Sequence, residues 1–98
     1  MRTITTGALK KKVVQPHKDF FLIDVREPEE YEAGHVPGAI LIPWDIIGQK
    51  IQGIKKDRPL ILYCQTGRRA NKAGLVLEQL GYTAVSIYEE GWEEWSNN

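Results

Sequence analysis

The sequence predicts an α/β protein built on a parallel sheet of about five strands, with helices on both faces. Four short apolar runs are spaced along the chain, and a shorter candidate precedes them; they cover residues 20–24, 39–42, 60–63, 83–88 and 2–4. The run at 60–63 is continuously apolar, which is typical of a strand buried on both faces of a parallel sheet. Helical patterns lie between the runs, and strands that alternate with helices favour right-handed crossovers.

Local signals place the first two helices. Thr5 or Thr6 can cap a helix that carries Leu9 and Val13 on one face, and Pro16 ends it. A second, short helix is expected over residues 28–33, because it has a proline at its first turn and acidic residues that complement the helix dipole.

The clearest helix is expected over residues 69–80. Four apolar residues, Ala70, Ala73, Leu77 and Leu80, form a stripe at helical spacing, and Gly81 is a suitable stop. A last short helix is expected near Gly91. In such a sheet, ligands bind beyond the carboxyl ends of the strands. Asp24, Cys64 and Tyr88 all fall at such ends, so we expect them to share one rim.

Composition limits the classes of function. The chain has 98 residues, which suits a single domain over 1–98, and its 42% hydrophobic content is typical of a globular protein. Thirteen basic and 13 acidic residues balance, so no nucleic-acid partner is expected. No apolar stretch is long enough for a membrane, and residues 1–12 lack the apolar core of a signal peptide. We therefore expect a cytoplasmic protein, and its single cysteine fits a reducing compartment.

The segment at residues 60–70 carries the chemistry. A buried strand runs into Cys64, a turn with Gly67 follows, and a helix starts at once. Backbone N–H groups in such a turn can form an anion nest, and the helix N-terminus together with Arg68 and Arg69 adds positive charge. Each effect favours the nucleophilic thiolate. A lone cysteine at a strand end is more often an inert core residue, but such a residue needs no flanking cations.

This loop resembles the active-site loop of the rhodanese family. Other segments resemble the family's remaining motifs, in the family's order: residues 24–31, residues 34–39, and Gly91 with Trp95. One departure is Glu90, which stands where the family usually has a second glycine before Gly91. The resemblance covers nearly the whole chain and implies a rhodanese-like sheet and a thiosulfate sulfurtransferase.

The resemblance implies a sulfur transfer in which Cys64 attacks the outer sulfur of thiosulfate, sulfite leaves, and the persulfide passes its sulfur to cyanide, a thiol or a protein acceptor. The expected substrate-binding residues follow the cysteine: Gln65, Thr66, Gly67, Arg68 and Arg69. Asp24 and Arg26 are expected to support the loop. Arg69 is expected to brace it through a carboxylate partner, and Arg68 to meet the donor.

Two other functions stay open. One is a persulfide carrier in a protein sulfur relay, and the other is a phosphatase or arsenate reductase of the related fold. Phosphatases of that group place a histidine before the cysteine and five residues before the arginine, whereas Tyr63 precedes Cys64 here and four residues separate it from Arg69. No cofactor is expected. No metal is expected either, because His17 and His35 lack a third ligand at suitable spacing.

Overall fold

Five parallel strands form one sheet in the computed structural model, which describes residues 1–98. The strand order is β1-β5-β4-β2-β3. The strands are β1 (Arg2–Thr3), β2 (Phe21–Asp24), β3 (Ile40–Leu41), β4 (Leu60–Tyr63) and β5 (Val85–Tyr88). The predicted sheet is therefore confirmed, and β4 lies at its centre with all of its residues buried.

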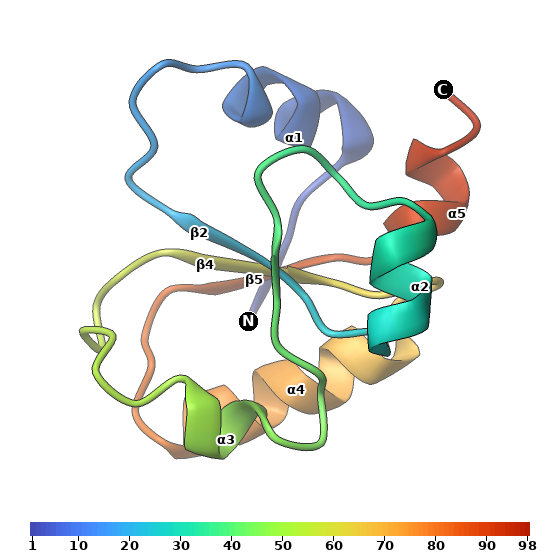
Figure 1. Ribbon diagram of the computed structural model, residues 1–98. Coiled ribbons are helices and arrows are strands. Elements are labelled where there is room, and N and C mark those ends of the chain that lie inside the picture. The colour runs from blue at the N-terminus through green and yellow to red at the C-terminus, as the bar shows by residue number, and fades with distance from the viewer.

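Helices cover both faces of the sheet. Figure 1 shows α1 and α5 on one side, and α3 and α4 on the other. The helices are α1 (Thr6–Val13), α2 (Pro28–Ala33), α3 (Ile47–Lys50), α4 (Arg68–Gln79) and α5 (Gly91–Trp95). None of them is long and apolar enough to cross a membrane.

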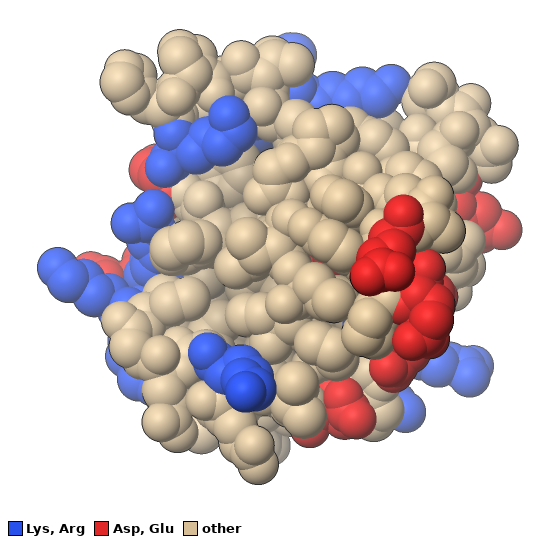
Figure 2. Space-filling view, in the orientation of Figure 1, with Lys and Arg blue, Asp and Glu red and all other residues tan.

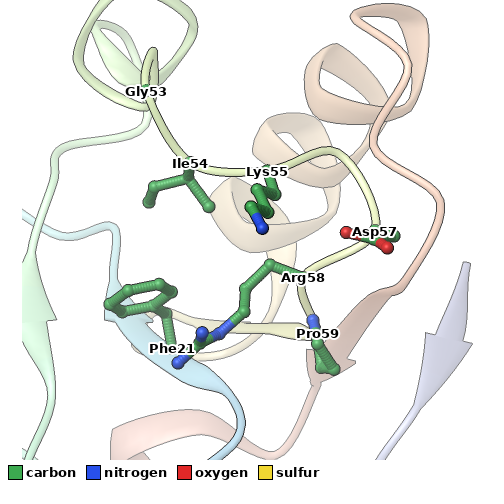
Figure 3. A pocket seen from close by; sticks show the side chains of 7 residues that line it. All are labelled: Phe21, Gly53, Ile54, Lys55, Asp57, Arg58 and Pro59. Carbon is green, nitrogen blue, oxygen red and sulfur yellow. The ribbon is translucent and has the colours of Figure 1, made fainter.

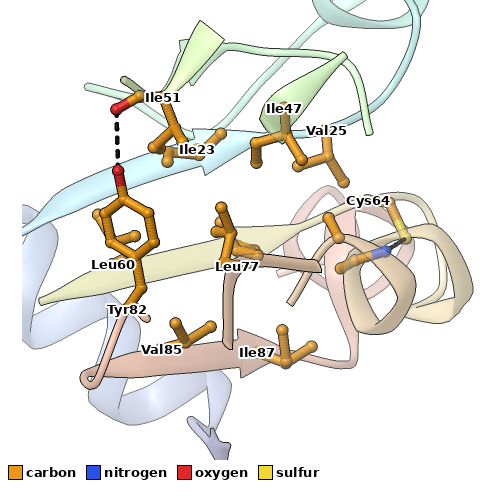
Figure 4. Packing of buried hydrophobic residues seen from close by; sticks show 13 residues of the cluster. Ile23, Val25, Ile47, Ile51, Leu60, Cys64, Leu77, Tyr82, Val85 and Ile87 are labelled. Atoms are coloured by element: carbon orange, nitrogen blue, oxygen red, sulfur yellow. Dashed lines mark hydrogen bonds between the residues drawn. The ribbon is translucent and has the colours of Figure 1, made fainter. Parts of the chain in front are cut away.

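Two apolar cores flank the sheet because side chains alternate between its faces. Ile23 and Leu62 belong to the core under α3 and α4, in which Tyr82 donates a hydrogen bond to the carbonyl of Ile51 at 3.1 Å (Figure 4). Leu22 and Ile61 belong to the core under α1 and α5. The cysteine is part of the first core.

The helices differ from the expected ones in two places. Helix α3, a single turn, was not expected, and its one fully buried side chain is Ile47. Leu80 was expected in the buried stripe of α4, but this was wrong: α4 ends at Gln79, and Leu80 is its C-cap residue and is 44% exposed. Ala70, Ala73 and Leu77 are fully buried, as the stripe predicts.

The strand register brings the expected residues to one rim. Asp24 of β2 pairs with Tyr63 of β4, and Tyr63 pairs with Tyr88 of β5. Cys64 follows Tyr63 directly, so the carboxyl ends of β2, β4 and β5 meet beside the cysteine. The shared rim predicted from the sequence is confirmed.

Candidate active site

The Cys64 sulfur lies at the centre of a tight loop between β4 and α4. Its Sγ accepts hydrogen bonds from the backbone N–H of Gly67 at 3.1 Å and of Ala70 at 3.4 Å. The residue is 1% exposed. Because both donors are backbone groups at the start of α4, the helix dipole adds to the field that favours a negatively charged sulfur.

Gly67 is required by the shape of this loop. Its φ is +98°, a left-handed conformation that side chains disfavour. A Cβ at this position would also lie 2.9 Å from the carbonyl oxygen of Glu89, which follows β5. The close contact between Gly67 and the β5–α5 connection therefore depends on the absence of a side chain.

The first turn of α5 fixes the other half of the loop. The N–H of Trp92 donates to the carbonyl of Cys64 at 2.9 Å, and the N–H of Glu93 donates to the carbonyl of Gln65 at 3.2 Å. Gly91 permits this approach because it has no side chain: a Cβ added at this position would lie 2.5 Å from the Gln65 carbonyl oxygen. The contact with the loop therefore needs glycine at position 91. The departure from the family pattern is at position 90, where Glu90 stands, and leaves this contact intact.

This arrangement leaves several backbone N–H donors of the loop without an acceptor. In a trans peptide the C=O and the following N–H point in opposite directions, so the N–H groups of Gln65 and Thr66 point away from α5. Neither N–H donates to another backbone group. The N–H groups of Arg68 and Arg69 have no acceptor either, so the loop and the start of α4 hold two N–H groups on the sulfur and four unused ones. Such a set of donors is what an anion nest requires.

Arg69 is held by a carboxylate from another part of the chain. Its guanidinium makes two hydrogen bonds to Glu30 of α2, at 2.7 and 3.0 Å. Glu30 also accepts the N–H of Glu27 at 2.9 Å. The hydrogen bond from Arg69 lowers the pKa of Glu30 to about 2, against a usual value of 4.5. The carboxylate partner expected for Arg69 is present, and it connects α2 to α4.

Asp24 and Arg26 form a second, buried ion pair beneath the loop. Nη2 of Arg26 lies 2.7 Å from Asp24 Oδ2, and Nε donates to Oδ1 of the same carboxylate at 3.0 Å. Arg26 also donates to the carbonyl of Gly34 at 2.7 Å and reaches the Gln65 amide oxygen at 3.5 Å. Its guanidinium carbon lies 5.3 Å from the centre of the Trp92 ring. The pair connects the cysteine loop to the segments on either side.

The surroundings of the loop are divided in charge. Arg68 is exposed and forms no ion pair in the structure. On the α5 side, a hollow of about 450 Å³ is lined by Thr66, Glu89, Glu90, Glu93, Glu94 and Asn97. None of these glutamates is in an ion pair. Figure 2 shows a further group of acidic side chains over the position of α2, while basic side chains are spread over the opposite side and also lie below this group.

Sequence reasoning missed several contributors to this site. Glu30 was read only as a helix-dipole residue, although a carboxylate at the third helical position is a recognisable capping signal. Ala70 was assigned to the helix stripe and not as a donor to sulfur. The four glutamates that line the hollow beside Thr66, called the acidic wall below, were not expected either; they are Glu89, Glu90, Glu93 and Glu94. His35, which was considered above only as a metal ligand, has its Nδ1 2.9 Å from the carbonyl oxygen of Tyr31.

Comparisons with known proteins identify the family of the chain. The rhodanese-like domain family matches residues 5–98. The chain is 40% identical over 74 residues to the uncharacterized protein YqhL of Bacillus subtilis, covering 76% of this chain and 59% of YqhL. It is 33% identical to the putative sulfurtransferase YtwF of the same organism, covering 97% of this chain and 90% of YtwF. Proteins named as sulfur carriers are also among its relatives.

A solved structure shows the same fold over the full chain. The human single-domain sulfurtransferase TSTD1 superposes with a TM-score of 0.89 at 27% identity, covering 100% of this chain and 97% of TSTD1. The match to the family extends from the first helix through α5 and includes every segment that forms the cysteine loop and its supports. The chain belongs to the rhodanese-like domain family.

Proposed function

We propose that this protein is a sulfurtransferase in which Cys64 carries a sulfane sulfur as a persulfide. The observation that supports this most is the position of the Cys64 Sγ, which faces the N–H groups of Gly67 and Ala70. The unused N–H groups of Gln65 and Thr66 lie in the same loop. Such a loop stabilises a negative sulfur through backbone donors that need no reorganisation.

The transfer balances without a cofactor. The Cys64 thiolate attacks the outer sulfur of thiosulfate, a Cys–S–S bond forms, and the thiosulfate S–S bond breaks with its electron pair leaving on sulfite. Cyanide or a thiolate then attacks the terminal sulfur of the persulfide. Its carbon–sulfur or sulfur–sulfur bond forms as the persulfide bond breaks, and the Cys64 thiolate is regenerated.

The surrounding side chains take separate roles in this proposal. Arg68 is the exposed cation that meets an anionic donor. Arg69 is oriented by its hydrogen bonds to Glu30 and adds positive charge beside the loop. Because Glu30 holds its guanidinium, Arg69 does not reach out to the donor as Arg68 does. Asp24 and Arg26 support the loop from beneath, and they transfer no proton.

A sulfur carrier in a protein relay is the second candidate, and the acidic wall favours it. Glu93 and Glu94 border the hollow that Thr66 enters, and neither is in an ion pair. Uncompensated carboxylates beside the loop repel a dianion such as thiosulfate at low salt, and they attract a basic protein surface. Because Cys64 is 1% exposed, any donor has to present its sulfur on a narrow group.

Charge removal at the acidic wall distinguishes the two donors. The double variant Glu93→Gln/Glu94→Gln is expected to raise kcat/KM for thiosulfate, with cyanide as acceptor, by about threefold to tenfold at low salt. The same variant is expected to slow sulfur uptake from a persulfide donor protein with a basic surface. Raising the salt to 0.5 M should remove most of both effects, because it screens exposed charges.

Asp19→Asn provides the matched control for charge, since Asp19 is exposed and precedes β2 at the opposite end of the sheet. It should leave both donors unaffected. Equal changes in Asp19→Asn and in Glu93→Gln/Glu94→Gln would show that the net charge of the protein, and not the acidic wall, determines how fast each donor reacts. Absence of Cys64-dependent transfer from either donor would overturn the proposed function.

A further inference from the structure

A second hollow, of about 500 Å³, lies at the end of the sheet opposite to Cys64 (Figure 3). Its lining consists of Phe21, Gly53, Ile54, Lys55, Asp57, Arg58 and Pro59. Phe21 begins β2 and Pro59 directly precedes β4, so the hollow lies at the amino ends of the strands. Sulfur transfer at the carboxyl ends makes no use of it.

Arg58 leaves a buried donor unsatisfied at this hollow. Its Nε is buried and has no hydrogen-bond partner, and among buried side-chain nitrogen and oxygen atoms it alone lacks one. The guanidinium carbon lies 4.6 Å from the centre of the Phe21 ring. The protein covers this Nε, while no carboxylate of the chain pairs with the guanidinium, so its positive charge remains uncompensated next to the hollow.

Lys55 adds a second cation to the same space. Figure 3 shows its ammonium group directed toward the region between Ile54 and Arg58. Neither Lys55 nor Arg58 forms an ion pair within the chain. Asp57 is the one acidic residue in the lining, and Figure 3 shows its carboxylate on the far side of Arg58 from Phe21. Two uncompensated cations therefore border the hollow.

The rest of the lining is partly apolar. The Phe21 ring and the Ile54 side chain face the hollow from the side opposite Asp57 (Figure 3). A volume of this size lies in the range of small-molecule sites, which combine apolar walls with a few polar groups that fix orientation. The lining thus matches a molecule that carries both a negative charge and an apolar body.

We propose that this hollow, the Arg58 pocket, binds small organic anions. An oxyanion such as a carboxylate is attracted by the Arg58 guanidinium and accepts a hydrogen bond from Lys55 Nζ, and the apolar part of the ligand packs against Phe21 and Ile54. The proposal is independent of the chemistry at Cys64, because it depends on a different end of the sheet and on residues that the cysteine loop does not contact.

Titration with benzoate, followed by two-dimensional NMR at constant ionic strength, tests the proposal. The Arg58 Nε–H signal and the Gly53 amide are expected to shift in a saturable manner. Inorganic phosphate tests the charge alone, and benzyl alcohol tests the apolar body alone. Benzoate should saturate at concentrations at least threefold lower than either. Equal or tighter binding of phosphate or of benzyl alcohol, or no saturable shift with benzoate, would overturn the proposal.

Three substitutions that each remove one positive charge sharpen the test. Arg58→Met should weaken benzoate binding by about tenfold or more, and Lys55→Met by about threefold or more. Lys56→Met is the matched control, since Lys56 lies outside the lining with its ammonium 4.1 Å from the Tyr82 ring centre, and it should change binding less than twofold. If Lys56→Met weakens binding as much as Lys55→Met does, the pocket is not the site. That comparison decides the matter even if Arg58→Met fails to fold.

Discussion

Two ion pairs support the cysteine loop, and they differ mainly in burial. The side chains of Asp24 and Arg26 are 0% and 2% exposed, whereas those of Glu30 and Arg69 are 33% and 27% exposed. Both pairs join a carboxylate to a guanidinium through more than one hydrogen bond. Two chemically similar ion pairs next to the same loop thus differ in solvent exposure: one is buried and the other is partly exposed.

Because the two pairs differ in burial, we expect one to contribute mainly to the stability of the fold and the other mainly to the activity of the loop. A buried pair has lost the hydration of both charges, so removal of either partner leaves an uncompensated charge inside the protein. A partly exposed pair is hydrated and screened by salt, and it contributes little to the free energy of unfolding. We therefore infer that Asp24 and Arg26 maintain the fold at the rim, and that Glu30 mainly fixes the position of Arg69.

The largest expected effect follows removal of the buried carboxylate. Asp24→Asn should lower the free energy of unfolding by about 3–5 kcal/mol, because it leaves Arg26 charged and buried without its partner. Urea unfolding monitored by circular dichroism measures the change. The double variant Asp24→Asn/Arg26→Met should recover part of the loss. A loss below 1 kcal/mol in the single variant would mean that the two pairs are equivalent.

Removal of the exposed carboxylate should act on activity more than on stability. Glu30→Gln is expected to change the free energy of unfolding by no more than about 1 kcal/mol. It should slow sulfur loading of Cys64 by about tenfold, because Arg69 loses its charge-assisted hydrogen bonds. Stopped-flow measurement of sulfite release from thiosulfate gives the loading rate.

Glu29→Gln is the control for this prediction, since Glu29 lies on the same helix, is exposed and forms no ion pair. It should load at the parent rate. Similar slowing in both variants would point to the general field of α2 and against a specific role of the Glu30–Arg69 pair.

A smaller effect is expected from acid. The pKa of Glu30 is lowered to about 2 in the folded protein, from a usual value of 4.5. Its contribution to stability is therefore fully present above pH 4.5 and is lost as the pH falls through about 2. The difference in unfolding free energy between the parent and Glu30→Gln should be constant at neutral pH and should shrink toward zero near pH 2. A difference that grows below pH 4.5 would contradict the assigned direction of the pKa shift.

Sequence reasoning predicted those parts of the fold that depend on local patterns. The central strand β4 and helix α4 were found because a continuous apolar run and a buried stripe are strong signals. The common rim of Asp24, Cys64 and Tyr88 followed from the parallel sheet alone. Helix α3 was missed because a single turn is too short to show a helical period.

The remaining parts of the site depend on contacts between distant segments. Glu30 and Arg69 are 39 residues apart, so nothing local identified the carboxylate that Arg69 would meet. Similarly, Gly91 excludes a side chain because the Cys64 and Gln65 carbonyls approach it. In the sequence, Gly91 was singled out by the family motif and as the start of a short helix, and the close approach of the two carbonyls appears only in the folded chain.

Intact-mass spectrometry of the thiosulfate-treated protein tests the role of Cys64 most directly. The parent protein should gain the mass of one sulfur atom, and cyanide or dithiothreitol should remove it, because a single thiolate lies among the backbone donors of the loop. Cys64→Ala should gain nothing under the same conditions. Sulfur uptake by Cys64→Ala, or no uptake by the parent from thiosulfate or from a persulfide donor protein, would contradict the proposed mechanism.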